Sequence, residues 1–210
     1  MTGRAELIRR GLVGVHLAPA TVVHDVAARD GGLSRLATAL TGGRTVVHDL
    51  DRGELRRARE AHLPAVRGDV RRLPFKDATS GLTLAFEIIE HFEPWEATAF
   101  LDELYRVTAP GGYLALTTPN RYSLQSLRGL ARYLRDGTVW NANDTTHIRL
   151  FSARALERAV ARRFTVRRRL GYYLVPEMRG RPTRWTFTVT QRPPLAAISH
   201  KLFILAQKPR

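Results

Sequence analysis

The sequence predicts an α/β fold, in which a mainly parallel sheet carries helices on both faces. Short apolar and β-branched segments alternate with helix-forming segments along most of the chain, as in βαβ units. The segment 82–89 (LTLAFEII) is apolar at nearly every position, which is typical of a strand covered on both faces. The last two strand-like segments have no predicted helix between them, which indicates an antiparallel edge. We therefore expect one mixed sheet.

The predicted elements follow one another in a regular order. Strands are expected at residues 21–25, 45–48, 63–68, 82–89, 113–117, 164–170 and 200–207. Two helices are expected at residues 33–40 and 54–62. A third is expected to begin at Pro94, because proline suits a first helical turn. A fourth is expected after Ser152, whose hydroxyl can cap a helix. In the third of these helices, apolar residues with a helical period mark the core-facing side: Trp95, Leu101, Leu104, Tyr105 and Val107. Pro110-Gly111-Gly112 ends that helix.

The length of 210 residues and the 44% of apolar residues predict a single domain over residues 1–210. Two segments, 121–146 and 171–195, interrupt the rhythm of strand and helix and are expected to be insertions on the substrate side. Their aromatic residues can line an apolar or aromatic substrate pocket, although such side chains also serve as core. These residues are Trp140, Tyr172, Tyr173, Trp185 and Phe187.

The formal net charge of +15 has two interpretations: a polyanionic partner or a solvated basic surface. The 34 basic residues include only three lysines, which leaves 31 arginines. They are scattered along the chain without interleaved aromatic residues. This distribution favours the solvated surface and argues against a nucleic-acid partner.

The chain contains no cysteine, which excludes a disulfide framework, a thiolate metal site and a cysteine nucleophile. No apolar run approaches the roughly 20 residues that span a bilayer. The first 20 residues are too interrupted by polar positions to indicate a signal peptide. We expect a cytoplasmic protein without a membrane partner.

Acidic side chains stand where successive predicted strands end. In a parallel sheet the ligand lies beyond the carboxyl ends of the strands. Asp25 opens a turn into a helix, and Asp49 ends the next strand, a spacing typical of an adenosine site in which the second acid holds the ribose. Asp69 follows the third strand and can accept from an adenine amino group, while Glu87 and Thr117 end the next two.

Four longer segments carry a resemblance to a known family: residues 68–77 (GDVRRLPFKD), 86–92 (FEIIEHF), 100–120 (FLDELYRVTAPGGYLALTTPN) and 147–156 (HIRLFSARAL). They resemble the class I S-adenosylmethionine-dependent methyltransferases, in the branch that modifies small molecules. The resemblance covers roughly residues 21–160 and the final strand. It implies a Rossmann-like seven-stranded sheet, mostly parallel, with its last strand antiparallel.

The resemblance also implies roles for single residues. Asp49 would hold the cofactor ribose, and Leu50 would pack on the adenine. Asp69 and Val70 would contact the adenine edge. The methionine end would lie against Phe86 and Glu87, and the first turn, from Asp25 to Gly31, would approach the cofactor through its backbone.

That first turn departs from the family pattern of an acid followed by Gly-x-Gly-x-Gly. It reads Asp25-Val-Ala-Ala-Arg-Asp-Gly31, with Ala27 and Arg29 at the first two glycine positions. Alanine costs little there if its φ stays negative. The Arg29 side chain must project either into solvent or into the methionine pocket, where it could pair with a carboxylate. The turn thus indicates either redirected binding or drift in a protein that has lost the cofactor.

His91 and His147 are the candidate catalytic bases, because both are expected near the pocket and an imidazole has a suitable pKa for proton transfer. His91 could instead only line the pocket, and Glu90 could fix His91 or a helix terminus. The remaining histidines show no metal-ligand spacing such as His-x3-His, so no metal site is expected.

Three functions follow from these observations. The first is methyl transfer from S-adenosylmethionine to an O or N atom of a small molecule in a biosynthetic pathway. The second is a methyltransferase fold repurposed for another reaction, such as a cyclisation or hydrolysis, or one without its cofactor. The third, an RNA-binding enzyme or module, is disfavoured because the segment after the fourth strand, 87–91 (EIIEH), is acidic.

Overall fold

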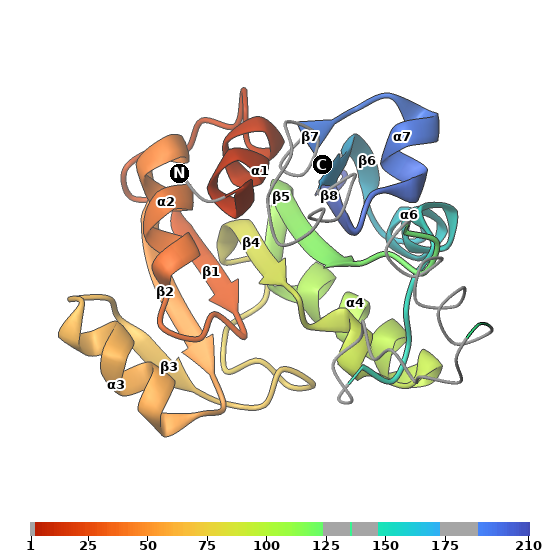
Figure 1. Cartoon of the computed structure of the whole chain (residues 1–210). Helices are drawn as coiled ribbons and strands as arrows, with labels where there is room; N and C mark the ends of the chain where they lie inside the picture. Colours follow the sequence, from red (N-terminus) through yellow and green to blue (C-terminus); the bar gives the residue numbers. More distant parts are fainter. Residues whose placement is uncertain (1–2, 124–134, 136–146, 173–188) are drawn as a thin grey trace.

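The computed structural model describes residues 3–123, 135, 147–172 and 189–210. The strands are β1 (Val22–Val26), β2 (Arg44–Asp49), β3 (Ala65–Arg67), β4 (Ser80–Phe86), β5 (Thr108–Pro119), β6 (Thr165–Tyr172), β7 (Val189–Thr190) and β8 (Lys201–Gln207). The helices are α1 (Gly3–Gly11), α2 (Gly32–Thr41), α3 (Arg52–Glu60), α4 (Pro94–Val107), α6 (Ala153–Ala161) and α7 (Pro193–Ile198), with a 3-10 helix η1 (Ile89–His91). Figure 1 shows their arrangement.

The described strands form one sheet in the order β3-β2-β1-β4-β5-β8-β6-β7. The pairs from β3 to β5 are parallel, and β8 runs antiparallel to both β5 and β6. The predicted α/β class, the mostly parallel sheet and the antiparallel last strand are confirmed. The structure adds β7, a two-residue strand at the edge beyond β6.

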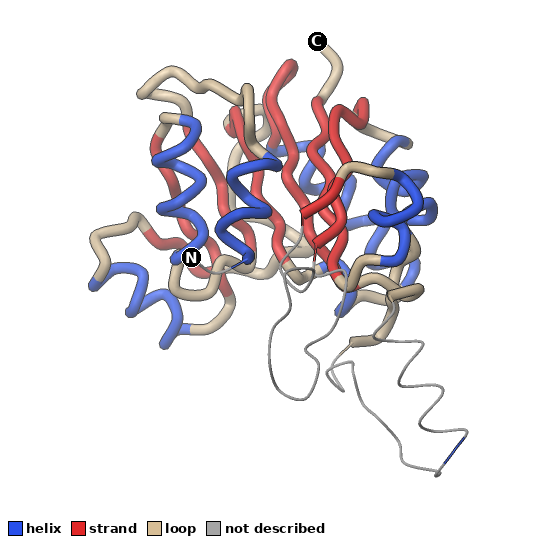
Figure 2. Tube along the Cα trace, turned by 45° about the horizontal axis from the view of Figure 1, so that its top comes forward, coloured by secondary structure: helices blue, strands red, loops and turns tan. Residues whose placement is uncertain are grey.

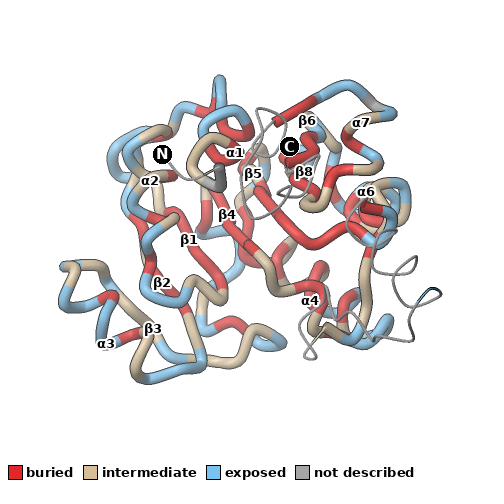
Figure 3. Tube along the Cα trace, viewed as in Figure 1, coloured by how far each residue is buried: buried red, intermediate tan, exposed pale blue. Residues whose placement is uncertain are grey.

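Helices cover both faces of this sheet (Figure 2). Side chains of β8 alternate between the two faces, as strand geometry requires. Leu202 and Ile204 join a buried cluster with α4 and α6, whereas Phe203 and Leu205 join a second buried cluster with α1 and α2. Figure 3 shows the resulting pattern, with buried strands in the middle and exposed outer helix surfaces.

Helix α4 packs on the sheet through Ala97, Phe100, Leu101, Leu104 and Val107, which are all buried. The prediction that Trp95 belongs to this face is wrong, because its side chain is 71% exposed. Each residue turns the helix by about 100°, so a residue two positions before Ala97 points to the opposite side.

Strand β5 begins at Thr108, five residues earlier than the predicted start, and therefore includes Pro110-Gly111-Gly112. Its pairing with β4 shifts register between Ser80 and Leu82. Gly111 has φ 77°, a left-handed conformation that favours glycine. The prolyl-glycine segment thus forms an irregularity inside the strand, and the helix ends before it.

Other boundaries differ near the chain ends and after β4. The sequence predicts a strand up to Ile89, but β4 ends at Phe86 and η1 follows. The predicted absence of a helix between the last two predicted strands is wrong, since α7 lies there, although the antiparallel edge forms. Helix α1 was not predicted. Of the aromatic pocket candidates, Trp140, Tyr173, Trp185 and Phe187 lie outside the described residues.

Candidate functional site

Strands β1, β2 and β4 run in parallel, so the residues that follow them gather at one edge of the sheet. This edge carries the turn after Asp25, the carboxylate of Asp49 and the side chain of Glu87, as the sequence predicts.

The turn after β1 uses left-handed backbone at alternate positions. Ala27 has φ 56°, Arg29 has φ 55° and Gly31 has φ 73°. The condition under which alanine would cost little at this position, a negative φ at Ala27, is therefore not met. The non-glycine residues hold this conformation because the turn is tied to β2: the Ala28 N–H donates to the His48 carbonyl over 3.1 Å, and the Arg29 N–H donates to Asp49 Oδ2 over 2.8 Å. The turn thus keeps the left-handed backbone of a glycine-rich turn, although Ala27 and Arg29 replace two of the glycines.

The Arg29 side chain projects into solvent, where it is 78% exposed, and its Nε lies 3.6 Å from Glu54 Oε1 on α3. Of the two predicted directions for this side chain, the structure shows the outward one. At position 29, the side of the turn that faces away from solvent therefore exposes only backbone atoms, as it would with a glycine at this position.

Asp25 lies beneath the turn rather than on its surface. It is 2% exposed, and it accepts a hydrogen bond from Ser34 Oγ on α2. Burial raises the pKa of Asp25 to about 7. Its carboxyl group joins β1 to the first turn of α2 and so supports the loop.

Asp49 stands at the end of β2 with each carboxylate oxygen engaged once. Oδ2 accepts from the Arg29 N–H, and Oδ1 accepts from the Asp51 N–H over 2.9 Å. A carboxylate has about four acceptor sites, so capacity remains for ribose hydroxyls. The neighbouring Leu50 is 59% exposed, and such an uncovered apolar side chain suits packing on a base.

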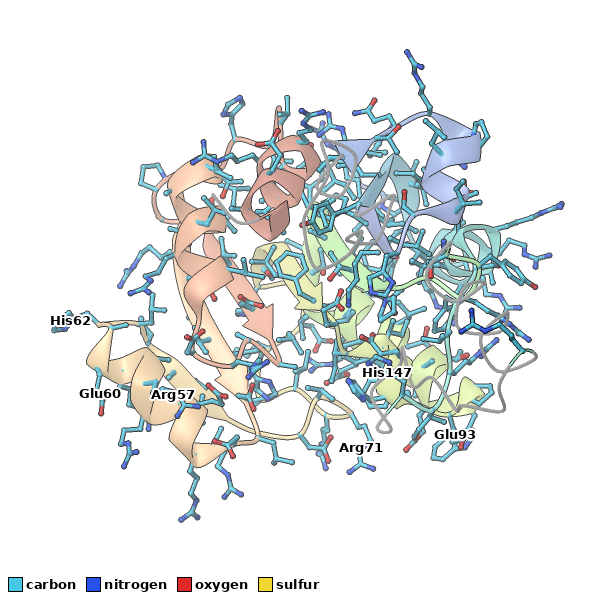
Figure 4. The ribbon with its side chains drawn as sticks, viewed as in Figure 1. Arg57, Glu60, His62, Arg71, Glu93 and His147 are labelled. Atoms are coloured by element: carbon cyan, nitrogen blue, oxygen red, sulfur yellow. The ribbon has the colours of Figure 1, made fainter. Side chains whose placement is uncertain are left out.

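Asp69, the predicted partner of the adenine amino group, pairs with Arg71. Arg71 Nη2 lies 2.5 Å from Asp69 Oδ2 and Arg71 Nε lies 3.0 Å from Oδ1, and these hydrogen bonds lower the pKa of Asp69. Val70 is half-buried and packs on the core cluster of α4. Figure 4 labels Arg71 near the lower border of the view. An adenine would have to share this carboxylate with Arg71.

Glu87 follows β4 in a left-handed conformation with φ 56°. Its Oε1 accepts from Thr117 Oγ1 over 2.9 Å, and its Oε2 accepts from the Lys201 ammonium. Sequence reasoning missed Lys201. The signal was available, because Lys201 opens the antiparallel strand β8 and so lies at the same edge as the ends of the parallel strands.

A small cavity of about 30 Å³ adjoins this ion pair. Its walls come from α1, α2 and the ends of β4, β5, β6 and β8: Leu7, Ile8, Leu33, Phe86, Glu87, Thr117, Tyr172 and Lys201. The predicted methionine-end residues Phe86 and Glu87 therefore meet helix α1 there. Tyr172, one of the predicted aromatic pocket residues, contributes to the same wall.

His91 and His147 come together beside η1, as predicted for two residues near one pocket. The Glu90 carbonyl accepts from the N–H groups of Ile148 and Arg149, each over 3.0 Å, which brings the segment after His147 against η1. The two imidazole ring centroids lie 5.1 Å apart. Figure 4 labels His147 near the middle of the view.

Glu90 is completely buried between the two elements. Its Oε2 accepts from Thr118 Oγ1 over 2.9 Å, and its Oε1 lies 3.9 Å from His147 Nε2. Burial, followed by the charge of Glu87, raises the pKa of Glu90 to about 7. The sequence suggested that Glu90 fixes His91 or a helix terminus; the structure shows that the backbone carbonyl of Glu90 also holds residues 148–149.

A larger cavity, of about 830 Å³, lies away from this edge. It is bounded by α6, β6, β8 and α7, with Leu156, Arg168, Ala196 and Phe203 among its walls. None of the residues predicted to bind the cofactor or to act as a base lines it. Its size alone therefore does not make it the site.

Comparison with known proteins tests this assignment of the edge. Residues 24–116, which run from β1 through most of β5, match the model of the methyltransferase domain family. This segment of the chain is similar to methyltransferase domains. It is 31% identical over 126 residues to demethylmenaquinone methyltransferase of Mycobacterium sp. strain JLS, an alignment that covers 57% of this chain and 52% of that protein.

A second relative of the methyltransferase domain is phthiotriol/phenolphthiotriol dimycocerosates methyltransferase 1 of Mycobacterium ulcerans. It is 32% identical over 116 residues, covering 53% of this chain and 42% of that one. The chain thus spans about half the length of the relatives it matches. These homologues are methyltransferases, and the small-molecule resemblance is confirmed.

Solved structures show the fold of the methyltransferase domain. The crystal structure of an S-adenosylmethionine-dependent methyltransferase from Mesorhizobium loti superimposes with a TM-score of 0.64 at 18% identity, and covers 99% of this chain and 98% of that one. The predicted Rossmann-like architecture is confirmed. In the part of the chain that the structure describes, no helix has both the length and the apolarity to cross a membrane.

Proposed function

We propose that this methyltransferase domain transfers a methyl group from S-adenosylmethionine to an O or N atom of a small molecule. The observation that carries the proposal is the turn after β1. It keeps the left-handed backbone at Ala27, Arg29 and Gly31 and turns the Arg29 side chain outward. The Arg29 side chain therefore does not fill the space that a glycine at this position would leave for a ligand.

The residues present fit this cofactor. Asp49 retains acceptor capacity for ribose hydroxyls, Leu50 offers an exposed apolar face to adenine, and Glu87 places a carboxylate at the methionine end. When bound, S-adenosylmethionine supplies a methyl group on a cationic sulfonium; the lone pair of the acceptor would bond to the methyl carbon in line as the C–S bond breaks and the sulfur leaves as a neutral thioether. Glu87 is paired with Lys201 and Thr117, so its position is fixed before a ligand arrives, which lowers the cost of orientation.

The acceptor would be bound on the side of η1. His91 and His147 lie there, and either imidazole could take the proton that the acceptor loses. The relatives include a demethylmenaquinone methyltransferase and a phthiotriol/phenolphthiotriol dimycocerosates methyltransferase, which supports an apolar or aromatic acceptor. Tyr172 and the apolar side chains of α1 at the small cavity support the same class.

The runner-up is a repurposed fold that has lost the cofactor and catalyses another reaction. Two observations favour it: the left-handed Ala27 and Arg29 add backbone strain, and Arg71 occupies the carboxylate that adenine would use. The two functions differ in one direct property, which is the affinity for S-adenosylmethionine and its demethylated product.

Calorimetric titration of the purified chain with both compounds tests the proposal. We expect one site per chain, and at least tenfold weaker binding in Asp49→Ala, because a hydrogen bond to a charged group contributes about 1.5–3 kcal/mol. Asp49→Asn, which keeps the shape, controls for a disturbed turn. Asp102→Ala removes an acid that pairs with Arg163 at the surface and should leave the affinity unchanged. Absence of heat with both compounds would overturn the proposal in favour of the repurposed fold.

A further inference from the structure

The geometry points to a binding site for a divalent cation of the zinc class, formed by Glu90, His91 and His147. One ligand atom from each of these three side chains lies within 4.8 Å of the others. Two of them come from η1, and the third comes from the segment that the Glu90 carbonyl holds against η1. The backbone contacts therefore fix the three donors together, independently of any ligand.

The distances suit an ion after a small contraction. A tetrahedral zinc ion about 2.1 Å from each donor separates its donors by about 3.4 Å. Glu90 Oε1 and His147 Nε2 are already 3.9 Å apart. The three donor atoms all lie within 4.8 Å of one another, so the wider separations must shorten by up to about 1.4 Å to reach the spacing around a zinc ion, and rotation of the two partly exposed imidazoles can supply this. Among the three donors, Glu90 has the least freedom to move, because its side chain is fully buried.

Glu90 gives a second, independent observation. Its side chain is fully buried, and Oε1 accepts no hydrogen bond from the described residues. A buried carboxylate oxygen without a donor is costly. The other oxygen is held by Thr118, so Oε1 is kept aimed at the two imidazoles. A cation between the three groups would satisfy this oxygen.

The donor set selects the class of ion. Two imidazole nitrogens and one carboxylate oxygen suit zinc and its neighbours in the first transition row, whereas magnesium prefers oxygen donors and octahedral geometry. Three protein donors leave one position open, as in catalytic zinc sites. The sequence pattern led to the expectation of no metal site, because the two histidines are far apart in the chain and follow no local ligand spacing.

The open position suggests what the ion does, and this part rests on the proposed function. It would take the hydroxyl oxygen of the methyl acceptor, and coordination would lower the pKa of that hydroxyl so that its proton passes to solvent water before the oxygen attacks the methyl carbon. The coordinated imidazoles could then no longer accept a proton, so the ion replaces them in activating the acceptor. An acceptor with a hydroxyl group is thereby favoured over an amine.

The test is metal binding itself. The chelator-treated chain is titrated with Co²⁺, whose visible absorption intensifies when the ion is four- or five-coordinate, and then with Zn²⁺ by competition. We expect one site per chain, displacement of Co²⁺ by Zn²⁺, and no displacement by Mg²⁺ at the same concentration. Glu90→Gln, His91→Asn and His147→Asn should each weaken binding at least tenfold.

His62→Asn is the matched control. This histidine is exposed after α3, and Figure 4 shows it on the far left of the view, well away from His147. Metal-free circular dichroism of each variant establishes that it folds; if Glu90→Gln does not, the two histidine variants decide. Absence of Co²⁺ binding, or equal loss in His62→Asn, would overturn the inference. Calorimetry with S-adenosylmethionine in chelator tests the proposed function separately, so either can fail alone.

Discussion

Arg29 keeps a backbone conformation that its side chain disfavours. A left-handed residue other than glycine stores strain, and such residues persist only when surrounding contacts hold them. Here the Asp49 carboxylate accepts the Arg29 N–H and the His48 carbonyl accepts the Ala28 N–H. The same carboxylate that is proposed to hold ribose thus also holds the turn. Because positions 27 and 29 are not glycines, the turn depends more strongly on Asp49 for its stability.

Arg29→Gly should stabilise the chain by about 1 kcal/mol, because glycine adopts this φ without strain. The lost ion pair to Glu54 is exposed and spans 3.6 Å, so it offsets little of the gain. Urea unfolding measures the change in the free energy of unfolding.

Arg35→Gly on the exposed side of α2 is the control, since glycine inside a helix costs about 1 kcal/mol relative to a good helix former. Opposite signs for the two substitutions are expected. Destabilisation by both would mean that the arginine side chain at position 29 contributes more than its backbone costs.

Among the elements, α4 shows that an apolar pattern displaced by one or two residues assigns a side chain to the wrong face of a helix. Trp95 fits an apolar stripe by composition, but Pro94 starts the helix and the core face begins at Ala97. The exposed tryptophan and the buried Phe100 therefore lie on different sides of one helix.

Phe100→Ala should destabilise the chain by about 3–5 kcal/mol through the cavity it leaves. Trp95→Ala on the same helix should cost well under 1 kcal/mol, because the side chain is exposed. Thermal and urea unfolding of both variants give the comparison. A large loss of stability in Trp95→Ala would show that this side chain is covered in solution.

The elements that the sequence predicts are those with strong local signals. The unbroken apolar run of β4, the Pro94 start of α4 and the Ser152 cap of α6 all depend on neighbouring residues. Strand β3, at the far edge, was also found from a short apolar run. Helix α7 was missed because it is only six residues long, and an isolated helix that short is marginal in water. Helix α1 was missed although, at nine residues, it is as long as α3 and α6.

In the candidate site, too, some residues could be predicted from local sequence signals and others depend on contacts between distant segments. Asp49 and Glu87 were predictable because a strand end fixes their position. The contact between Glu90 and His147 was not, since it requires the segment after His147 to return to η1 through two backbone hydrogen bonds. Lys201 reaches Glu87 only because β8 lies next to β5 and runs against it.

Over the whole molecule, buried imidazoles couple stability to pH. His24 stacks on Phe75 with ring centroids 3.7 Å apart, and burial lowers the pKa of His24 to about 4. Burial also lowers the pKa of His48. These groups are neutral in the folded chain, so their unfolded forms bind protons first as the pH falls below 6.5. The raised pKa values of Asp25 and Glu90 act in the opposite direction over the same range.

A variant isolates the histidine effect from that of the acids. His24→Phe keeps a ring against Phe75 but cannot be protonated. Relative to the parent chain, its free energy of unfolding should rise as the pH falls from 6.5 to about 4, by up to about 3 kcal/mol. Urea unfolding of both chains at several pH values measures this difference. A difference that does not change with pH would show that His24 is not the titrating group.

The position of β8 has a consequence for how the chain is made. Strand β6 leaves the ribosome before β8, yet in the finished sheet it meets β5 only through β8, which lies between them. Until residues 201–207 emerge from the ribosome, one edge of β5 has no partner strand, and β6 lacks its neighbour β8. An unpaired strand edge is a template for association with other chains. Premature termination or slow synthesis just before Lys201 should therefore release aggregating fragments, whereas a few further residues close the sheet.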